Sequence, residues 1–175
     1  MHNKIGEILL SEDEIIKRSK QLGKQISKDF EGKPLIAVGL LNGCVPFFAE
    51  LIKHIDIPLK IDFIRVKSYY GGTTSGDLKI VNDLELDVKD AYVLLIDDVV
   101  DSGKTMVNIK NFLLLKGAKE VKVCTLLNKP SSHVEEDLVL DYIGFNIGDE
   151  FIIGYGLDYD EYYRNLPYVA IFKQD

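Results

Sequence analysis

The sequence lacks the features that mark secreted, membrane-embedded or nucleic-acid-binding chains. It has two cysteines, Cys44 and Cys124, and no C-x-x-C pair that would indicate a disulfide framework or a zinc site. No apolar run approaches the length of a membrane span, and residues 1–10 lack the apolar core of a signal peptide. No pronounced basic run offsets the net charge of -7, which argues against a dedicated nucleic-acid binder. We therefore expect a cytoplasmic protein with buried thiols that binds neither membranes nor nucleic acids.

What the chain has instead is an alternation of helical and extended patterns over 175 residues, a length typical of one domain. A capping box at Ser11 and Glu14 predicts the start of a helix that ends before Gly32. Further helices are predicted from about Val45 to Lys53 and from the 101–105 segment to Lys116. Strands are predicted at 34–40, 59–67, 78–81, 91–96, 120–127, 142–145, 151–153 and 168–172.

This order of elements predicts an α/β fold with a Rossmann-like, parallel-rich central sheet flanked by helices. We expect the N-terminal segment and residues 145–175 to form a small hood over the carboxyl edge of that sheet. Residues 68–77 interrupt the alternation, because their glycines and hydroxyl residues cannot build a core. We interpret this segment, which begins with Ser68 and Tyr69, as a mobile active-site lid, and a simple hairpin connection is the alternative.

The stretch from Ala91 to Met106 has the strongest chemical pattern in the chain. Residues 91–96 are all apolar or aromatic and do not alternate, which is typical of a strand covered on both faces. Asp97, Asp98 and Asp101 follow at its carboxyl end, where ligands bind in open α/β sheets. Residues 102–105, Ser-Gly-Lys-Thr, then offer hydroxyls, a glycine turn and a helix start, which together make an anion seat. The stretch thus offers carboxylates for hydroxyls or a metal, next to a cradle for a phosphate.

Two other interpretations compete for this stretch. Gly103-Lys104-Thr105 matches the end of a P-loop, but that motif requires a glycine where Asp98 stands, and the carboxylates would repel a triphosphate. The structural alternative is that Asp101 or Ser102 caps the helix while the preceding acids are solvated turn residues. We expect such a cap in any case. It does not explain three carboxylates crowded at the end of a buried strand, where each loses hydration and repels its neighbours.

Residues 94–105 resemble the phosphoribosyl diphosphate signature of type I phosphoribosyltransferases: an apolar strand, two acids, two apolar residues and Asp-Ser-Gly-Lys-Thr. The segments that resemble the hypoxanthine-guanine branch are Leu41-Asn42-Gly43-Cys44, Lys67-Ser68-Tyr69, Asn128-Lys129-Pro130 and residues 151–167. Together they extend the resemblance from about residue 36 to residue 172. It implies a purine-salvage glycosyltransferase that moves the 5-phosphoribosyl group from phosphoribosyl diphosphate to N9 of hypoxanthine or guanine, giving IMP or GMP and pyrophosphate.

The resemblance also implies how phosphoribosyl diphosphate is bound. The ribose hydroxyls would meet Asp97 and Asp98, although Asp97 replaces the glutamate usual in the family and is one methylene shorter. The pyrophosphate would meet Arg164 and the backbone of 41–44, where the first peptide bond can be cis in the family and Asn42 replaces a lysine of some relatives. The residues implied in binding this substrate are Leu41, Asn42, Gly43, Asp97, Asp98, Asp101, Ser102, Gly103, Lys104, Thr105 and Arg164.

At the purine end, the resemblance implies that Phe151 stacks on the base and that Lys129 donates to its 6-oxo group, which selects against adenine. Backbone groups of Ile152 and Asp158 would read the remaining edge. Asp101 is the implied base for the N7 proton. Magnesium ion would be bound by Asp97, Asp98 and Asp158. Without the resemblance we would assign Phe151 to the core and Lys129 to the surface.

Two alternatives to this function stay open at the sequence level. Some relatives of this fold are regulators that bind RNA and sense nucleotides, although the acidic charge balance here argues against that role. The enzyme could also prefer another base: xanthine, because backbone atoms mainly read the 2-position, or a pyrimidine, although Lys129 and Phe151 favour 6-oxopurines. The family tends to associate, so we expect a homodimer or a homotetramer.

Overall fold

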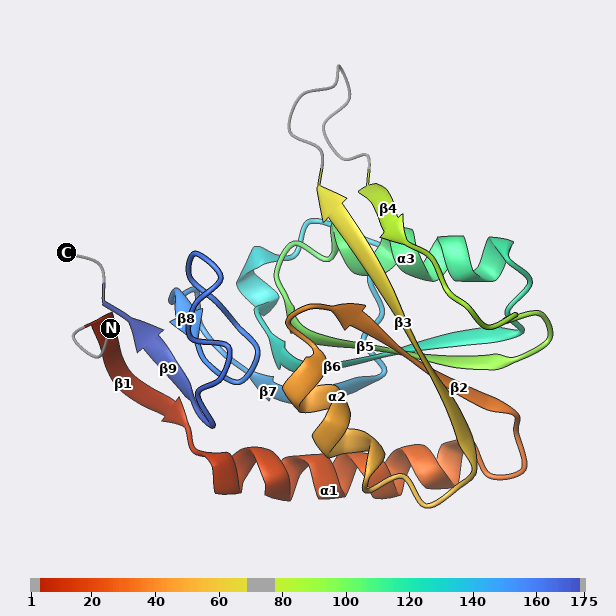
Figure 1. Ribbon diagram of the computed structural model, residues 1–175, viewed down its shortest axis with the longest axis horizontal. Helices are drawn as coiled ribbons and strands as arrows, with labels where there is room; N and C mark the ends of the chain where they lie inside the picture. The colour runs from red at the N-terminus through yellow and green to blue at the C-terminus, as the bar shows by residue number, and fades with distance from the viewer. Residues whose placement is uncertain (1–3, 69–77, 174–175) are drawn as a thin grey trace.

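The computed structural model describes residues 4–68 and 78–173, which form a larger and a smaller sheet together with helices (Figure 1). The helical segments are α1 (Glu12–Asp29), α2 (Val45–Ile52), α3 (Lys104–Leu115) and the 3₁₀ turn η2 (Pro130–Ser132). The strands are β1 (Ile5–Leu10), β2 (Leu35–Leu41), β3 (Leu59–Ser68), β4 (Leu78–Asn82), β5 (Tyr92–Val100), β6 (Glu120–Asn128), β7 (Tyr142–Asn146), β8 (Ile152–Ile153) and β9 (Val169–Phe172). No helix among the described residues is long and apolar enough to cross a membrane.

The larger sheet has the order β4-β3-β2-β5-β6-β7, and every pairing in it is parallel except that of β3 with β4. Helices lie on both faces of this sheet (Figure 1). The predicted α/β fold with a parallel-rich sheet is therefore confirmed. β5 lies between β2 and β6 near the middle of the sheet, so the stretch with the strongest chemical pattern also forms its central strand.

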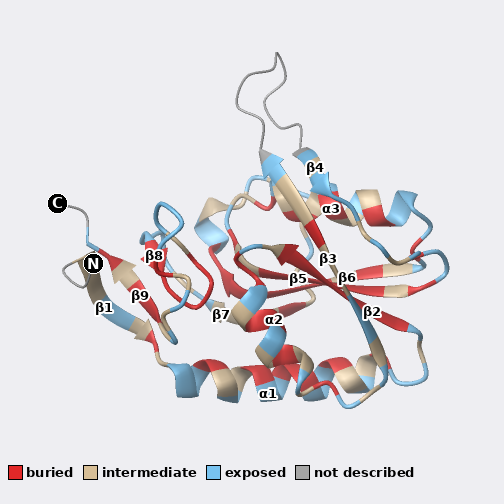
Figure 2. Cartoon of the chain, in the orientation of Figure 1, coloured by how far each residue is buried: buried red, intermediate tan, exposed pale blue. Residues whose placement is uncertain are grey.

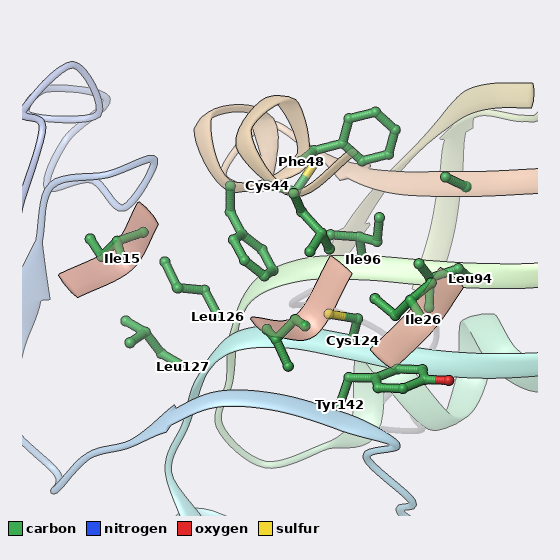
Figure 3. Packing of buried hydrophobic residues seen from close by; sticks show 14 of the residues in the cluster. Ile15, Ile26, Cys44, Phe48, Leu94, Ile96, Cys124, Leu126, Leu127 and Tyr142 are labelled. Atoms are coloured by element: carbon green, nitrogen blue, oxygen red, sulfur yellow. The ribbon is translucent and has the colours of Figure 1, made fainter. Parts of the chain in front are cut away.

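β5 is buried on both faces because its side chains enter two separate cores. Leu94 and Ile96 join the core that includes Ile26 of α1, and Figure 3 shows these residues close together. Val93 and Leu95 point to the other core, which includes residues of α3. The central strands are mostly red in Figure 2, which reflects this two-sided burial. Such a position explains the unbroken apolar run in the sequence.

β5 extends beyond its predicted end because it stays paired with β6 after it has parted from β2. The last β2–β5 pair is Gly39 with Ile96, whereas the β5–β6 pairing continues to Val100 and Asn128. The prediction that the strand ends before Asp97 is therefore wrong, and both acids of the pair lie within the strand. The separation of β2 from β5 opens the carboxyl edge of the sheet at these acids.

The N-terminal helix follows its prediction closely. Ser11 Oγ accepts from the backbone N–H of Glu14 at 3.4 Å, while the Glu14 carboxylate accepts from the backbone N–H of Ser11 at 2.8 Å. This reciprocal pair is the capping box expected from the sequence. Ile15, Leu22 and Ile26 are buried against the sheet, as their helical spacing predicts.

A small antiparallel sheet in the order β1-β9-β8 brings the N-terminal segment beside the C-terminal one (Figure 1). The predicted hood is therefore present. No strand is predicted from the sequence at residues 5–10, because Lys4 and Glu7 lie among the apolar residues there. The strand forms because β9 provides a pairing edge, and a Cβ at Gly6 would lie only 2.7 Å from the carbonyl oxygen of Ile171.

The expected lid falls largely outside the described residues. Ser68 is the last residue of β3 and pairs with Leu78, the first residue of β4. Tyr69 and the remainder of the predicted lid up to residue 77 lie in the part of the chain that the structure does not describe.

Candidate active site

A cavity of about 320 Å³ opens at the carboxyl edge of the sheet, where β2 and β5 separate. It is formed by the ends of β2, β3 and β5, by the segment that leads into α3, and by one arginine from the C-terminal part of the chain. The lining residues are Leu40, Leu41, Gly43, Val66, Asp97, Asp98, Val99, Val100, Asp101, Ser102, Gly103, Thr105, Met106 and Arg164. Most residues predicted to bind phosphoribosyl diphosphate therefore meet in one cavity, whereas Asn42 and Lys104 do not line it.

Asp97 and Asp98 form a close carboxylate pair at the base of this cavity. Asp97 Oδ1 accepts from the backbone N–H of Asp98 at 2.9 Å, and Asp98 Oδ1 accepts from the backbone N–H of Val99 at 2.8 Å. Burial and the adjacent Asp98 carboxylate raise the pKa of Asp97. Burial also raises the pKa of Asp98, with Arg164 acting in the opposite direction. The pair is thus short of positive charge and hydrogen-bond donors, which ribose hydroxyls and a divalent cation can supply.

The segment after β2 packs directly on this pair. A Cβ at Gly43 would lie 1.9 Å from Asp98 Oδ2, so only glycine permits the approach. On its other side the segment is contacted by Gly156, where a Cβ would lie 1.9 Å from the Gly43 carbonyl oxygen. The peptide bond between Leu41 and Asn42 is cis. Backbone groups of this segment are therefore held beside the carboxylates.

The segment between β5 and α3 has the geometry of an anion seat, but its cap differs from the prediction. Gly103, in the left-handed region at φ 83°, is the N-cap of α3 and makes no side-chain capping hydrogen bond. The N-cap is therefore neither Asp101 nor Ser102, because the chain turns at the one residue without a Cβ, although Ser102 Oγ accepts from the backbone N–H of Lys104 at 3.4 Å. Gly103 also packs tightly against Leu138, where a Cβ would lie 2.6 Å from a methyl carbon. Apart from that of Lys104, the N–H groups of the first turn of α3 have no partner within the helix and can donate to an anion in the cavity.

Arg164 lines the cavity and is bonded to the turn that precedes it in the chain, residues 156–161. Its guanidinium donates to the Gly156 carbonyl at 2.8 Å and forms ion pairs with Asp158 at 2.8 Å and with Glu161 at 3.1 Å. These partners fix a cation opposite the carboxylate pair. Asp158 also accepts from the backbone N–H of Glu161 at 2.9 Å, which closes the turn.

The residues predicted for the purine lie beside the cavity rather than in its lining. Lys129 is 9% exposed, and its ammonium donates to the Glu150 carbonyl at 3.0 Å and lies 3.5 Å from Asp101 Oδ1. Phe151 is 44% exposed, and its ring makes edge contacts with Tyr159 and Phe172 at centroid distances of 5.9 and 5.6 Å. Lys129 therefore sits between the anion seat and an exposed aromatic ring.

Ile152 and Asp158 complete the set of predicted purine residues. Ile152 is buried in β8, so its backbone is fixed by the pairing with Ile171 of β9. Asp158 is linked to the cavity through Arg164. The predicted purine residues are thus joined to the predicted phosphoribosyl residues by two ion pairs, Lys129 with Asp101 and Asp158 with Arg164.

The carboxylates provide the hard oxygen donors that Mg²⁺ prefers. Within residues 4–68 and 78–173, no three acidic, histidine or cysteine side chains gather into a ready-made metal cluster. Mg²⁺ typically keeps water and takes substrate phosphate oxygens, with one or two carboxylates from the protein. Asp97, Asp98 and Asp158 fit this open kind of site in their chemistry.

Several residues of the site were not identified from the sequence. Glu161 shares Arg164 with Asp158, and it adopts a positive φ of 64°, which no local pattern indicates. Gly156 lies within residues 151–167, which carry part of the resemblance, but its contact with Gly43 joins segments far apart in the chain. Leu138 packs against Gly103, and it belongs to a loop without a regular hydrophobic pattern in the sequence. Each of these contacts depends on tertiary packing, so the sequence offered no direct signal for them.

Comparison with known proteins places this site in a family. The phosphoribosyl transferase domain model matches residues 6–160. The hypoxanthine-guanine phosphoribosyltransferase of Lactococcus lactis subsp. lactis is 48% identical over 172 residues, which cover 98% of this chain and 93% of that protein. The protein of the same name from Streptococcus pneumoniae is 46% identical, covering 100% of this chain and 97% of that one.

Solved structures agree with the sequence comparison. A hypoxanthine phosphoribosyltransferase from Staphylococcus aureus has a TM-score of 0.93 and 44% identity, covering 99% of this chain and 94% of that one. A hypoxanthine-guanine phosphoribosyltransferase from Bacillus anthracis has a TM-score of 0.91 and 37% identity, with coverage of 98% and 99%. Both likenesses extend over nearly the whole of each chain. The chain therefore belongs to the phosphoribosyltransferase family, within the group of the hypoxanthine-guanine phosphoribosyltransferases.

Proposed function

We propose that the protein transfers the 5-phosphoribosyl group of phosphoribosyl diphosphate to N9 of hypoxanthine or guanine, giving IMP or GMP and pyrophosphate. The observation that most supports this function is the arrangement of one cavity. In it the Asp97–Asp98 pair lies directly beside the anion seat of residues 101–105, and Lys129 stands 3.5 Å from Asp101 at its border. Full-length relatives with 44–48% identity have the corresponding name.

The proposed pose of phosphoribosyl diphosphate follows from the chemistry of each part of the cavity. The 5′-phosphate binds the N–H and hydroxyl donors of residues 101–105, at the positive end of α3. The ribose hydroxyls donate to Asp97 and Asp98. The pyrophosphate lies against the backbone of 41–44 and the Arg164 guanidinium, which together provide donors and positive charge.

The purine binds between Phe151 and Lys129 in this proposal. The exposed ring of Phe151 offers a stacking surface, and Lys129 has a third ammonium proton free for the 6-oxo oxygen after its contacts with Glu150 and Asp101. Adenine presents a donor where Lys129 also presents donors, so it is rejected. Backbone groups of Ile152 and Asp158 read the remaining edge.

In the proposed reaction the bond between C1 of the ribose and the pyrophosphate oxygen breaks, and positive charge develops on the ribose ring. N9 of the purine then forms the new bond to C1 with inversion, while the proton on N7 passes to Asp101. Arg164 stabilises the charge of the departing pyrophosphate. Ser68 and Tyr69, at the start of the expected lid, would exclude water from the ring cation.

Mg²⁺, which enzymes of this family use with phosphoribosyl diphosphate, would be held by Asp97, Asp98 and, through water, by Asp158. It would neutralise phosphate charge when bound.

We also propose a cytoplasmic enzyme, which two buried free cysteines support, and a homodimer or homotetramer. Light scattering on the protein as it elutes from a size-exclusion column measures its mass and so tests the oligomeric state.

The test of function is an assay with phosphoribosyl diphosphate, Mg²⁺ and each free base. We expect IMP and GMP from hypoxanthine and guanine, and no product from adenine, while xanthine measures the alternative preference. Asp101→Asn should lower turnover far more than substrate binding, because it removes the base and keeps the shape. Full turnover of this variant with hypoxanthine would refute the role of Asp101.

The relatives with known names do not favour the alternative of an RNA-binding regulator, and filter binding tests it directly. Tight, salt-sensitive RNA binding without turnover would replace the enzymatic proposal.

A further inference from the structure

We propose that Asp149 is a positioning residue for the purine, because it locks the segment that includes Lys129 onto the segment that ends in Phe151. This inference rests on the proposed function. Ser131 Oγ donates to Asp149 Oδ1 at 2.6 Å, and Ser132 Oγ donates to the same oxygen at 3.2 Å. Both serines belong to η2, which begins directly after Lys129. Asp149 lies two residues before Phe151, so one carboxylate oxygen joins the two halves of the purine site.

The ammonium of Lys129 depends on this connection. It donates to the carbonyl of Glu150, the residue next to Asp149, at 3.0 Å and lies 3.5 Å from Asp101. A lysine has three donors, so one is left for the 6-oxo oxygen of a base. The direction of that last donor is set by where the Glu150 carbonyl lies. If residues 149–150 shift, both the ammonium and the Phe151 ring shift with them.

A separate group of hydrogen bonds anchors the start of each segment. Asn128 Nδ2 donates to Asn146 Oδ1 at 2.8 Å, which leaves Asn128 Oδ1 to accept from His133 Nε2 at 2.7 Å. The Ile147 N–H also donates to the Asn128 carbonyl at 2.9 Å. These bonds hold residues 146–147, which precede Gly148 in the chain, whereas the Phe151 ring follows it. Among the residues that the structure describes, the bonds to Asp149 and the Lys129–Glu150 bond are the hydrogen bonds that join the two segments near Phe151.

The contacts of Asp149 are suited to positioning rather than to stabilising the fold. Both serine hydrogen bonds are exposed to solvent, where such bonds contribute little to folding. Hydrogen bonds from Ser131 and Ser132 lower the pKa of Asp149, so the carboxylate is ionised at neutral pH and accepts both bonds. Loss of the clamp should therefore affect purine binding without unfolding the protein.

The experiment compares Asp149→Ala, Asp149→Asn and the double variant Ser131→Ala/Ser132→Ala with the unmutated protein. Asp149→Ala should raise KM for hypoxanthine about threefold to tenfold, because two hydrogen bonds to a charged acceptor are lost. KM for phosphoribosyl diphosphate and the thermal midpoint should stay unchanged. Asp149→Asn keeps an oxygen acceptor and should restore the KM for hypoxanthine, and the double serine variant should match Asp149→Ala. Glu136→Gln, an exposed acid in the same region, is the matched control.

The outcomes separate the inference from the function on which it rests. Normal turnover of Asp149→Ala with an unchanged KM for hypoxanthine would overturn the positioning role alone. Equal rises in both KM values, or a lowered thermal midpoint that Asp149→Asn does not restore, would indicate a general structural role and overturn it as well. No turnover by the unmutated protein with any base would overturn the proposed function, and the inference with it. If Asp149→Ala does not fold, the serine variant decides by the same two KM values.

Discussion

Replacing Gly43 by alanine tests the contact between the segment after β2 and the carboxylate pair. An alanine Cβ would lie 1.9 Å from Asp98 Oδ2, whereas real Cβ contacts are essentially never under 3.0 Å, so the groups must separate by about 1.1 Å, the difference between the two. Asp98 cannot swing away freely, because its other oxygen accepts from the Val99 N–H at 2.8 Å. The segment cannot retreat freely either, because Gly156 packs against the Gly43 carbonyl. We therefore expect the displacement to fall on the substrate-binding geometry.

A displacement of about 1 Å at a reacting centre lowers catalysis on the order of 100-fold. We expect this loss in kcat/KM for phosphoribosyl diphosphate, measured by IMP formation at saturating hypoxanthine. Gly32→Ala is the control. A Cβ at Gly32 would have open space around it, so this variant adds only the backbone strain of a φ of +71°. It should lower the free energy of unfolding by about 1 kcal/mol and leave kcat/KM unchanged. A Gly43→Ala enzyme within about threefold of the unmutated kcat/KM would show that this contact does not shape the site.

Three further predictions address the purine site and the core. Lys129→Gln should lower kcat/KM for hypoxanthine about 10-fold to 100-fold, because a charged hydrogen bond is lost; a kcat/KM that stays within about twofold of the unmutated value would exclude the 6-oxo contact. Phe151→Leu should raise KM for hypoxanthine about fivefold and spare KM for phosphoribosyl diphosphate, whereas no change in either value would argue against stacking. Ile26→Ala removes a fully buried side chain and should lower the free energy of unfolding by about 2–5 kcal/mol in urea titrations. A urea midpoint unchanged by Ile26→Ala would contradict the packing of α1 on the sheet.

The parts of the fold that follow local rules were predictable from the sequence. The capping box of Ser11 and Glu14 and the buried spacing of α1 are properties of one helix, and the unbroken apolar run of β5 reflects its two covered faces. β1 and the true end of β5 were not predictable. Both are set by a partner strand, β9 in the first case and β6 in the second, and a pairing partner leaves no mark in the strand's own pattern.

The identities of the site residues were more predictable from the sequence than the contacts between them. The acids 97, 98 and 101 and the glycine at 103 belong to one contiguous motif, and nearly all of it lines the cavity. The contacts that bring Gly156 to Gly43, or Ser131 to Asp149, join residues that are distant or unremarkable in the sequence. The cap of α3 was mispredicted for a related reason. Asp101 and Ser102 are good capping residues, but the left-handed turn at Gly103 determines where the helix begins.

The position of the carboxylate pair explains why the site needs such close packing around it. Placing Asp97 and Asp98 inside a strand with two buried faces is unfavourable for the free protein, as their raised pKa values indicate. The two cores on either side of β5 offset this cost and keep the strand rigid through the acids. A rigid pair can then be approached closely by the backbone at Gly43 and faced by Arg164. The same desolvation that disfavours the buried acids in the free protein favours a ligand that offers hydroxyls and positive charge.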